Sequence, residues 1–507
     1  MARPPRAWLA PDLAFAMAAL ALFYALLIFQ APRRLFRDAD AGWHIRYGEQ
    51  LLERRAPAGR DPFSFSRAGQ PWFAWEWGAD LVMGWAHRAA GLRGVVMLYL
   101  SAIGITVWLW VRLTWAAGGD FFLACLLLAP ALTTASLHWL ARPHVFGWIC
   151  LLLTLWAAEK APPAVRWRRG ALWAVFGAAW ANLHASFFLG PLVLGLYACG
   201  EWIRPWIWEV PAAEARSRGR GLALAGVCSL AGSFANPFGW RLHGHVVEYL
   251  FNTELLARVA EFQSFNFHVE GAAQIALAFG AGCIGAVAAL AMGRPGRFLV
   301  MALLLAAALR SARGLPVAAM AVLPLANGSL AEALRALAGL RPPVRRWLDR
   351  ALRYSANLRA LELRFHGAAL APPVLAAAWA VLLLLPASAF GFDPKEFPVA
   401  ASERVAQLPP GARLFSNDKF GGYLIYRFAG QRPVWFDGRS DFYGAAFMKS
   451  YLRMVELRPG WREDWTRAGF THALTPAQAP LAGALRGLGW RVLFEDSTAV
   501  LLERPRE

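Results

Sequence analysis

The sequence has few charged residues for its length. Only 17% of its 507 residues are Asp, Glu, Lys or Arg, whereas 58% are hydrophobic. A soluble globular protein carries about 25% charged residues, so this composition excludes a soluble domain as the bulk of the chain. Apolar runs of about 17–25 residues, the length that a helix needs to cross a bilayer, recur along most of the sequence. The sequence therefore predicts an all-α polytopic membrane protein.

Cysteine is scarce, and other chemical signatures are missing. All five cysteines fall in apolar runs: Cys125, Cys150, Cys199, Cys228 and Cys283. No disulfide framework is expected from such positions. No third ligand accompanies His243 and His245 at zinc-site spacing, which argues against a zinc site. No glycine-rich phosphate loop follows a strand, which argues against a nucleotide as direct donor.

The net charge of +19 is consistent with a nucleic-acid binder or with membrane topology. Lys and Arg concentrate in the short loops between apolar runs, where the positive-inside rule expects them on the cytoplasmic side. We therefore expect the lipid bilayer, and no nucleic acid, as a partner. Arg3 and Arg6 precede the first apolar run, which predicts a cytoplasmic N-terminus in a bacterial inner membrane. No Ala-x-Ala site closes that run, so its pattern is not that of a cleavable signal.

About eleven transmembrane helices are predicted, followed by a small C-terminal domain. The expected spans are 13–29, 94–113, 121–136, 144–158, 171–185, 187–203, 221–235, 272–292, 298–310, 315–327 and 368–389. Successive spans cross the membrane in alternating directions. The chain then divides into a transmembrane domain, 1–392, with an external loop at 30–93, and a periplasmic domain, 393–507. The segment 328–366 carries eight arginines and is predicted to include a basic amphipathic helix on the inner membrane face; a solvated charged face is the simpler alternative.

The C-terminal domain is predicted to be α/β, because short strand patterns alternate with helical ones. The expected helix is Ala477–Leu488, and the expected strands are Ala412–Ser416, Pro433–Asp437, His472–Thr475, Arg491–Glu495 and Ala499–Glu503. Asp437 to Asp441 follow one of these strands and form either a sugar-binding or partner-binding loop or, more simply, an Asp-Gly turn with a local Arg–Asp pair.

Two carboxylates, Asp38 and Asp40, lie in the first residues beyond the first apolar run. Ionisable residues at a membrane boundary are costly, so they are functional candidates. The pair can supply a general base or hard oxygen ligands for Mg²⁺ or Mn²⁺. Alternatively, Asp40 only caps a helix at 41–54 while Asp38 pairs with a nearby arginine. His44 follows, as a phosphate-binding or a structural histidine.

Further polar residues fall at the same ends of the predicted spans. In the expected topology these ends are external: His138, Arg142, His144, Asn182, His184, Ser186, Arg310 and Arg313. Polar groups in lipid must meet partners or a watery cavity, so their convergence with Asp38 and Asp40 predicts one site. Interfacial snorkelling is the alternative, and it covers Arg310 and Arg313 well.

Several motifs together resemble bacterial GT-C-type membrane glycosyltransferases of an uncharacterised branch. They cover nearly the whole chain: Asp38-Ala39-Asp40-Ala41-Gly42-Trp43-His44, Asp61-Pro62-Phe63-Ser64-Phe65, Glu76-Trp77, Arg142-Pro143-His144, Trp180-Ala181-Asn182-Leu183-His184, Asn236-Pro237-Phe238-Gly239 and Asp437-Gly438-Arg439. The resemblance implies a GT-C fold, a polyprenyl-phosphate-linked sugar donor, and an acidic residue of the first loop as base or metal ligand. Many such enzymes carry Asp-Glu where this chain has Asp-Ala-Asp, so either Asp is the counterpart.

The resulting hypothesis is an inverting glycosyltransferase that moves a sugar from a polyprenyl-phosphate donor to an envelope acceptor on the periplasmic face. Asp38 and Asp40 are the expected catalytic residues, and a divalent cation, if one is used, would bind to them. The expected substrate-binding residues are His44, Glu76, Arg142, His144, Asn182 and His184. The alternatives are a non-catalytic polytopic scaffold or transporter for envelope glycan, and a ligase that moves a whole lipid-linked glycan.

Overall fold

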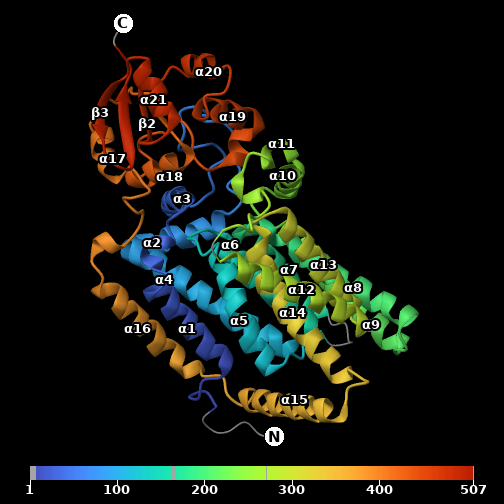
Figure 1. Cartoon of the computed structure of the whole chain (residues 1–507). Helices are drawn as coiled ribbons and strands as arrows, with labels where there is room; N and C mark the ends of the chain where they lie inside the picture. Colours follow the sequence, from blue (N-terminus) through green and yellow to red (C-terminus); the bar gives the residue numbers. More distant parts are fainter. Residues whose placement is uncertain (1–6, 162–166, 270, 506–507) are drawn as a thin grey trace.

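The structure is a computed structural model that describes residues 7–161, 167–269 and 271–505. Figure 1 shows a bundle of long helices with an α/β part stacked on one end and the helix α15 (Pro342–Glu362) lying across the other end. The part of the chain that directly follows the first helix of the bundle lies at the α/β end (Figure 1). The candidate site lies at that end, between the bundle and the α/β part.

Each of the eleven predicted apolar segments coincides with a helix of the bundle. These helices are α1 (Leu13–Leu27), α4 (Trp77–Ala116), α5 (Phe121–Ser136), α6 (His144–Glu159), α7 (Trp167–Leu183), α8 (Leu189–Ile207), α9 (Ala212–Ser233), α12 (Ala272–Ala291), α13 (Pro295–Arg310), α14 (Gly314–Ala336) and α16 (Ala371–Leu384). The apolar periodicity therefore predicted where the bundle helices lie.

The predicted number of membrane spans is wrong. Within the described residues, four helical segments are long and apolar enough to cross a membrane: Trp77–Ala116, Ala185–Ile207, Ala272–Ala291 and Gly314–Ala336. Four others are apolar but shorter, such as α5 and α6 with 16 residues each. At a rise of about 1.5 Å per residue, 16 residues cover about 24 Å, less than the bilayer core of about 30 Å. The helix α9 begins with a charged turn, which shortens its apolar part.

The acidic stretch begins helix α3 (Asp40–Arg54), but Asp40 does not cap it. The N-cap residue is Ala39, and Asp40 lies in the first turn. The carboxylate of Asp38 accepts the backbone N–H of Asp40 at 3.0 Å, so Asp38 has the capping role that was predicted for Asp40. One of the free N–H groups at the helix start is thereby satisfied. The carboxylate of Asp40 remains available for another partner.

Helices α3 and α4 pack closely at two glycines, and this contact positions two residues of the candidate site, His44 and Asp80. A Cβ atom on Gly48 would lie 1.8 Å from the carbonyl oxygen of Asp80, and one on Gly84 would lie 2.2 Å from the carbonyl carbon of Gly48. The lack of side chains lets the two backbones meet, which brings His44 of α3 beside Asp80 of α4. The helix α4 begins well before the predicted span at 94–113, with a break at Gly91 (φ +61°).

The α/β part contains a four-stranded sheet. Its strand order is β1-β2-β4-β3, with β1 (Leu414–Ser416) parallel to β2 (His472–Pro476) and antiparallel pairing of β4 (Ala499–Glu503) with β2 and with β3 (Arg491–Glu495). The helices of this part are α17 (Val399–Ala406), α18 (Asp418–Arg427), α19 (Ser440–Val455), α20 (Trp461–Ala468) and α21 (Pro480–Gly487). Four of the five predicted strands are confirmed. The division of the chain at 392 stays a prediction.

The fifth predicted strand, 433–437, is wrong. Its backbone pairs with the external loop instead of the sheet. The N–H of Val434 donates to the carbonyl oxygen of Phe63 at 2.9 Å, and the N–H of Phe65 donates to that of Val434 at the same distance. The apolar residues of this segment gave a strand pattern, but that pattern does not specify the partner. The pairing ties the α/β part to the loop that carries the acidic stretch.

The α/β part also contacts helix α3 directly. A Cβ atom on Gly42 would lie 2.4 Å from the carbonyl oxygen of Gly422 in α18, and one on Gly422 would lie 2.7 Å from that of Ala39. The two helices therefore cross at backbone contact beside Asp40. At the opposite end, the predicted basic amphipathic helix is observed as α15, while residues 328–336 belong to α14. Its location on a membrane surface stays a prediction.

Candidate active site

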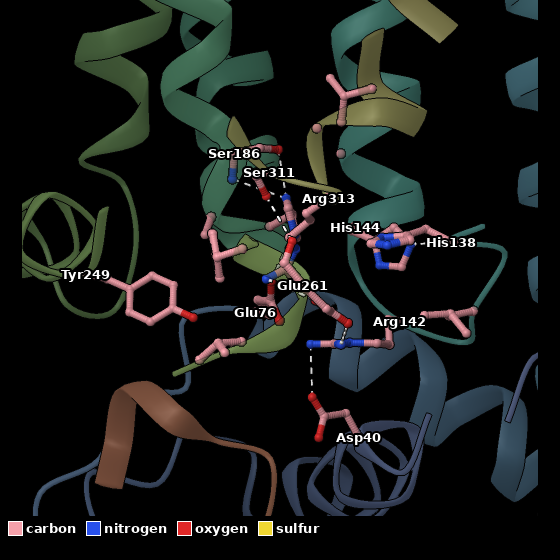
Figure 2. A pocket seen from close by; sticks show the side chains of 18 of the residues that line it. Asp40, Glu76, His138, Arg142, His144, Ser186, Tyr249, Glu261, Ser311 and Arg313 are labelled. Carbon is pink, nitrogen blue, oxygen red and sulfur yellow. Dashed lines mark hydrogen bonds and ion pairs between the residues drawn. The ribbon is translucent and has the colours of Figure 1, made fainter. Parts of the chain in front are cut away.

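A cavity of about 830 Å³ lies between the bundle and the α/β part. Figure 2 shows its polar wall, to which distant segments of the chain contribute. The polar lining includes Asp38, Asp40, Glu76, His138, Arg142, His144, His184, Tyr249, Glu261, Arg313 and Asp441. The apolar lining includes Leu151, Leu189, Leu192, Leu250, Leu303 and Leu304. The predicted convergence of polar helix ends is therefore observed for most of the residues named from the sequence.

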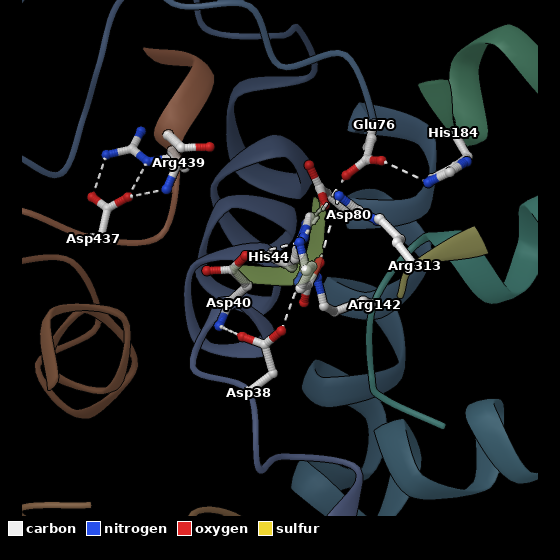
Figure 3. Close-up of polar contacts among 12 residues, drawn as sticks. Asp38, Asp40, His44, Glu76, Asp80, Arg142, His184, Arg313, Asp437 and Arg439 are labelled. Atoms are coloured by element: carbon white, nitrogen blue, oxygen red, sulfur yellow. Dashed lines mark hydrogen bonds and ion pairs between the residues drawn. The ribbon is translucent and has the colours of Figure 1, made fainter. Parts of the chain in front are cut away.

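Arg142 is the centre of the polar wall (Figure 3). Its Nη1 atom lies 2.6 Å from Oδ2 of Asp38 and 3.2 Å from Oε1 of Glu261, and its Nη2 atom lies 2.9 Å from Oδ2 of Asp40. The Arg142 side chain is only 15% exposed. Charge-assisted bonds of this kind are stronger than neutral ones. One buried guanidinium thus holds three carboxylates in one arrangement.

The electrostatics of this cluster follow from its excess of carboxylates. Burial raises the pKa of Asp40 to about 8, and the charge of Arg142 opposes that shift only in part. Burial also acts to raise the pKa of Glu261, but Arg142 and Arg313 outweigh it and lower that pKa to about 2. Three carboxylates share one guanidinium, and at neutral pH Asp40 is the one that keeps a proton.

Glu261 is also held from the side of the bundle. Its Oε2 atom lies 3.6 Å from Nη1 of Arg313. Its backbone carbonyl accepts the N–H of Arg313 at 3.1 Å and the hydroxyl of Ser311 at 2.9 Å. The loop that carries Glu261 is therefore fixed to the end of α13 and the start of α14, so that its carboxylate reaches Arg142.

A loop of the α/β part covers Asp40. A Cβ atom on Gly438 would lie 2.0 Å from Oδ1 of Asp40, so only glycine fits there without a shift. The next residue, Arg439, pairs with Asp437 through Nε–Oδ1 and Nη2–Oδ2 contacts of 2.7 Å each, and with Asp61 at 2.8 Å. The expected local Arg–Asp pair is observed. The pair also joins the turn to the external loop.

A second acidic group lies in the same cavity. Oε1 of Glu76 lies 3.3 Å from Nε2 of His184, and its Oε2 lies 3.9 Å from Nε2 of His44. Nδ1 of His44 in turn lies 2.5 Å from Oδ1 of Asp80. Burial raises the pKa of Glu76 to about 7, against the opposing charges of Arg142 and Arg313. The sequence singled out three of these four residues and missed Asp80.

Two other predicted residues have structural partners. His144 lines the cavity, and its Nε2 atom lies 2.7 Å from the carbonyl oxygen of His138. The side-chain oxygen of Asn182 accepts the indole N–H of Trp77 at 2.7 Å, and its amide donates to two backbone carbonyls. Asn182 is outside the cavity lining and holds α7 against α4. The pair His243 and His245 separates: His243 bonds Ser233, and His245 bonds Asp441.

The described residues do not present a ligand set for the expected Mg²⁺ or Mn²⁺. Among them, no group of three or more His, Cys, Asp or Glu side chains gathers closely enough to hold a metal ion. Asp38 and Asp40 both pair with Arg142, so the guanidinium stands where a cation bridging them would stand. We derive no step through a metal ion.

No protein-family model and no curated protein matches the sequence. The structure does match solved structures. It is similar to the archaeal oligosaccharyltransferase AglB from Archaeoglobus fulgidus in complex with an inhibitory peptide and a dolichol-phosphate, with a TM-score of 0.58 and 12% identity over 92% of this chain and 69% of that chain. The apo form of an oligosaccharyltransferase from the same organism matches with a TM-score of 0.51, at the same identity and coverage.

The chain has the GT-C-type fold. At 12% identity the likeness establishes the fold alone, and it supports the fold that the sequence motifs implied. The bacterial branch and the polyprenyl-phosphate donor stay predictions. Because 92% of this chain aligns, the likeness extends beyond the helical bundle into the α/β part.

Proposed function

We propose that this protein is a membrane glycosyltransferase that takes a sugar from a polyprenyl-phosphate-linked donor and attaches it to an envelope acceptor on the periplasmic face of a bacterial inner membrane. The observation that carries the proposal is the composition of the cavity. One wall is apolar and the other holds buried carboxylates around Arg142. A lipid-linked donor has the same two-part chemistry, with an apolar chain and a charged, sugar-bearing head.

The donor would lie with its lipid along the leucine-rich wall and its phosphate toward the cations. Leu192 is 40% exposed, so this wall extends to the outside of the bundle. Arg313 lies in the same cavity and faces Glu261 at 3.6 Å, a contact weak enough to be exchanged for phosphate. Arg142 and His184, two of the expected substrate-binding residues, would hold the same phosphate.

The acceptor would lie against Asp38 and Asp40. In the reaction a lone pair of the acceptor's O–H or N–H group forms a bond to the anomeric carbon, while the bond from that carbon to the phosphate oxygen breaks. The lipid phosphate leaves with the electron pair, and the acceptor loses its proton to a base on the protein. Attack opposite the leaving phosphate inverts the anomeric centre. Arg142 stabilises the charge that develops on the phosphate.

Transfer of a whole lipid-linked glycan is a second candidate. The oligosaccharyltransferase fold favours it, and a cavity of about 830 Å³ is large enough for several sugar units. The two candidates share donor class and chemistry and differ in the length of glycan moved. Donors with one sugar and with a longer glycan, offered separately, distinguish them by their kcat/KM values.

The test is a transfer assay with purified protein in lipid nanodiscs. The donors are polyprenyl-phosphate-linked glycans with tritium in the sugar, extracted from membranes of the source cells, and the acceptor is the delipidated envelope fraction. We expect labelled acceptor with the wild-type protein. In a parallel assay with the protein in lipid vesicles, movement of labelled donor across the membrane without transfer would instead indicate a transporter, and neither activity would indicate a scaffold.

A further inference from the structure

Four side chains form a line that runs from the cavity into the protein interior (Figure 3). In order, they are His184, Glu76, His44 and Asp80. Glu76 and His184 line the cavity, whereas the side chains of His44 and Asp80 are 0% and 1% exposed. Buried ionisable groups cost free energy unless they are paired or used. The burial of His44 and Asp80 therefore indicates that these side chains are paired or have a function.

His184 is held in one tautomer. The backbone N–H of Ser186 donates to its Nδ1 atom at 3.1 Å. A ring nitrogen that accepts a hydrogen bond has no proton, so the neutral ring carries its proton on Nε2. Its Nε2 atom lies 3.3 Å from Oε1 of Glu76. One oxygen of Glu76 therefore lies beside His184, and the other faces His44.

Asp80 holds His44 on the side of the ring opposite Glu76. Its Nδ1 atom lies 2.5 Å from Oδ1 of Asp80, and this contact sets the ring so that Nε2 faces Oε2 of Glu76 at 3.9 Å. Among the described residues, Nε2 of His44 has no hydrogen-bond partner. Contacts between catalytic groups are often long in a free enzyme and shorten when substrate binds. A proton on Glu76 would complete the line by bridging this gap.

We propose that Glu76 takes the proton that the acceptor loses, and that His44 and Asp80 position Glu76 for this step. This inference rests on the proposed function. As the acceptor's lone pair forms the bond to the anomeric carbon and the phosphate oxygen leaves with its electron pair, the proton moves to Oε2 of Glu76. There it is shared with Nε2 of His44. Asp38 and Asp40, both tied to Arg142, then orient the acceptor.

Electrostatics support this division of roles. Burial raises the pKa of Glu76 to about 7 and that of Asp40 to about 8, so near neutral pH Glu76 is the better ionised of the two. A general base works best when its pKa lies near the operating pH. The charged and titratable groups that face Glu76 come from each packed element: His44, Asp80, Arg142, His184, Arg313 and Asp441.

The test compares variants of the full chain in the same transfer assay. We expect Glu76→Gln to lower kcat at least 100-fold, the lower end of the usual range for a general base, with the donor KM unchanged. The acid limb of the pH profile, with a midpoint near pH 7 in the wild type, should be lost. For the positioning residues, His44→Gln and Asp80→Asn should each lower kcat about tenfold and displace this midpoint by about half a pH unit or more.

A matched control is available in a second Glu–His pair. Glu49 lies 2.6 Å from Nδ1 of His87, outside the cavity lining. Glu49→Gln should leave kcat and the pH midpoint at wild-type values. If Glu76→Gln fails to fold, as judged by gel filtration and melting temperature, Glu76→Asp replaces it. The shorter side chain keeps the charge but withdraws from the acceptor, so we expect a loss in kcat that donor concentration does not restore.

The outcomes separate the inference from the function on which it rests. If the wild type transfers glycan and Glu76→Gln does so with the same kcat and pH midpoint, the inference is overturned and the function stands. If Asp80→Asn lowers only the melting temperature, its positioning role is overturned. If the wild type transfers nothing from any lipid-linked donor, the proposed function itself is overturned.

Discussion

Replacement of Arg142 by methionine should strongly destabilise the protein. The guanidinium is 15% exposed and contacts three carboxylates at 2.6, 2.9 and 3.2 Å. Arg142→Met removes the shared cation, so Asp38 loses its ion-pair partner and Glu261 keeps only its longer contact with Arg313. Loss of one partner from a buried ion pair costs about 3–5 kcal/mol, whereas an exposed pair contributes about 0–1 kcal/mol. We expect the free energy of unfolding to fall by about 3–5 kcal/mol.

The assay is SDS-induced unfolding of the purified protein in detergent micelles. Arg345→Met is the matched control, because Arg345 pairs with Asp349 one turn along helix α15 and its side chain is 38% exposed. That control should lose less than about 0.5 kcal/mol. Adding Asp38→Asn to Arg142→Met removes one uncompensated charge and should restore about 1–3 kcal/mol. A loss below about 1 kcal/mol for Arg142→Met would refute the account of Arg142 as the buried centre of the site.

Three further predictions test the cavity. Burial raises the pKa of Asp40 from 3.8 to about 8, so its proton stabilises the folded state fully at low pH, and that stabilisation is lost as the pH rises from about 4 to about 8. Asp40→Asn should flatten the fall in melting temperature over that range. Gly438→Ala brings a Cβ within 2.0 Å of Asp40 and should lower kcat about tenfold by displacing that carboxylate, whereas Gly59→Ala, with no atom within 4 Å, should not. Leu192→Trp narrows the apolar wall and should raise the KM of long-chain donors about tenfold while leaving that of short-chain donors unchanged; equal effects on both would contradict a lipid-binding wall.

The sequence predicted the positions of the bundle helices well, because apolar periodicity depends on local residues. It did not predict how many of them can cross a bilayer, since helix ends depend on packing. The predicted span 298–310 is part of α13, which begins at Pro295, and 315–327 is part of α14, which ends at Ala336. In the α/β part, β3 and β4 have the predicted limits, whereas segment 433–437 pairs with a distant loop.

The candidate site was predicted in part. Asp38, Asp40 and Arg142 were named because charged residues stand out beside apolar runs, and the structure brings them together. Glu261 was missed because it lies in an ordinary polar loop, 119 residues from its partner Arg142. Asp80 carried a signal that was not used, a lone carboxylate close to a long apolar run. The capping of α3 by Asp38 instead of Asp40 was not predictable, because both are acceptable capping residues.

The central claim is that the cluster around Arg142 transfers a glycan from a lipid-linked donor. The most direct measurement is the rate at which tritium moves from polyprenyl-phosphate-linked glycan to the envelope acceptor, for the wild type and for the double variant Asp38→Asn, Asp40→Asn. Both changes are isosteric, and the folded state is checked by gel filtration and melting temperature. The account predicts transfer by the wild type and a loss of at least 100-fold in the double variant. Transfer at the wild-type rate by a folded double variant would contradict it.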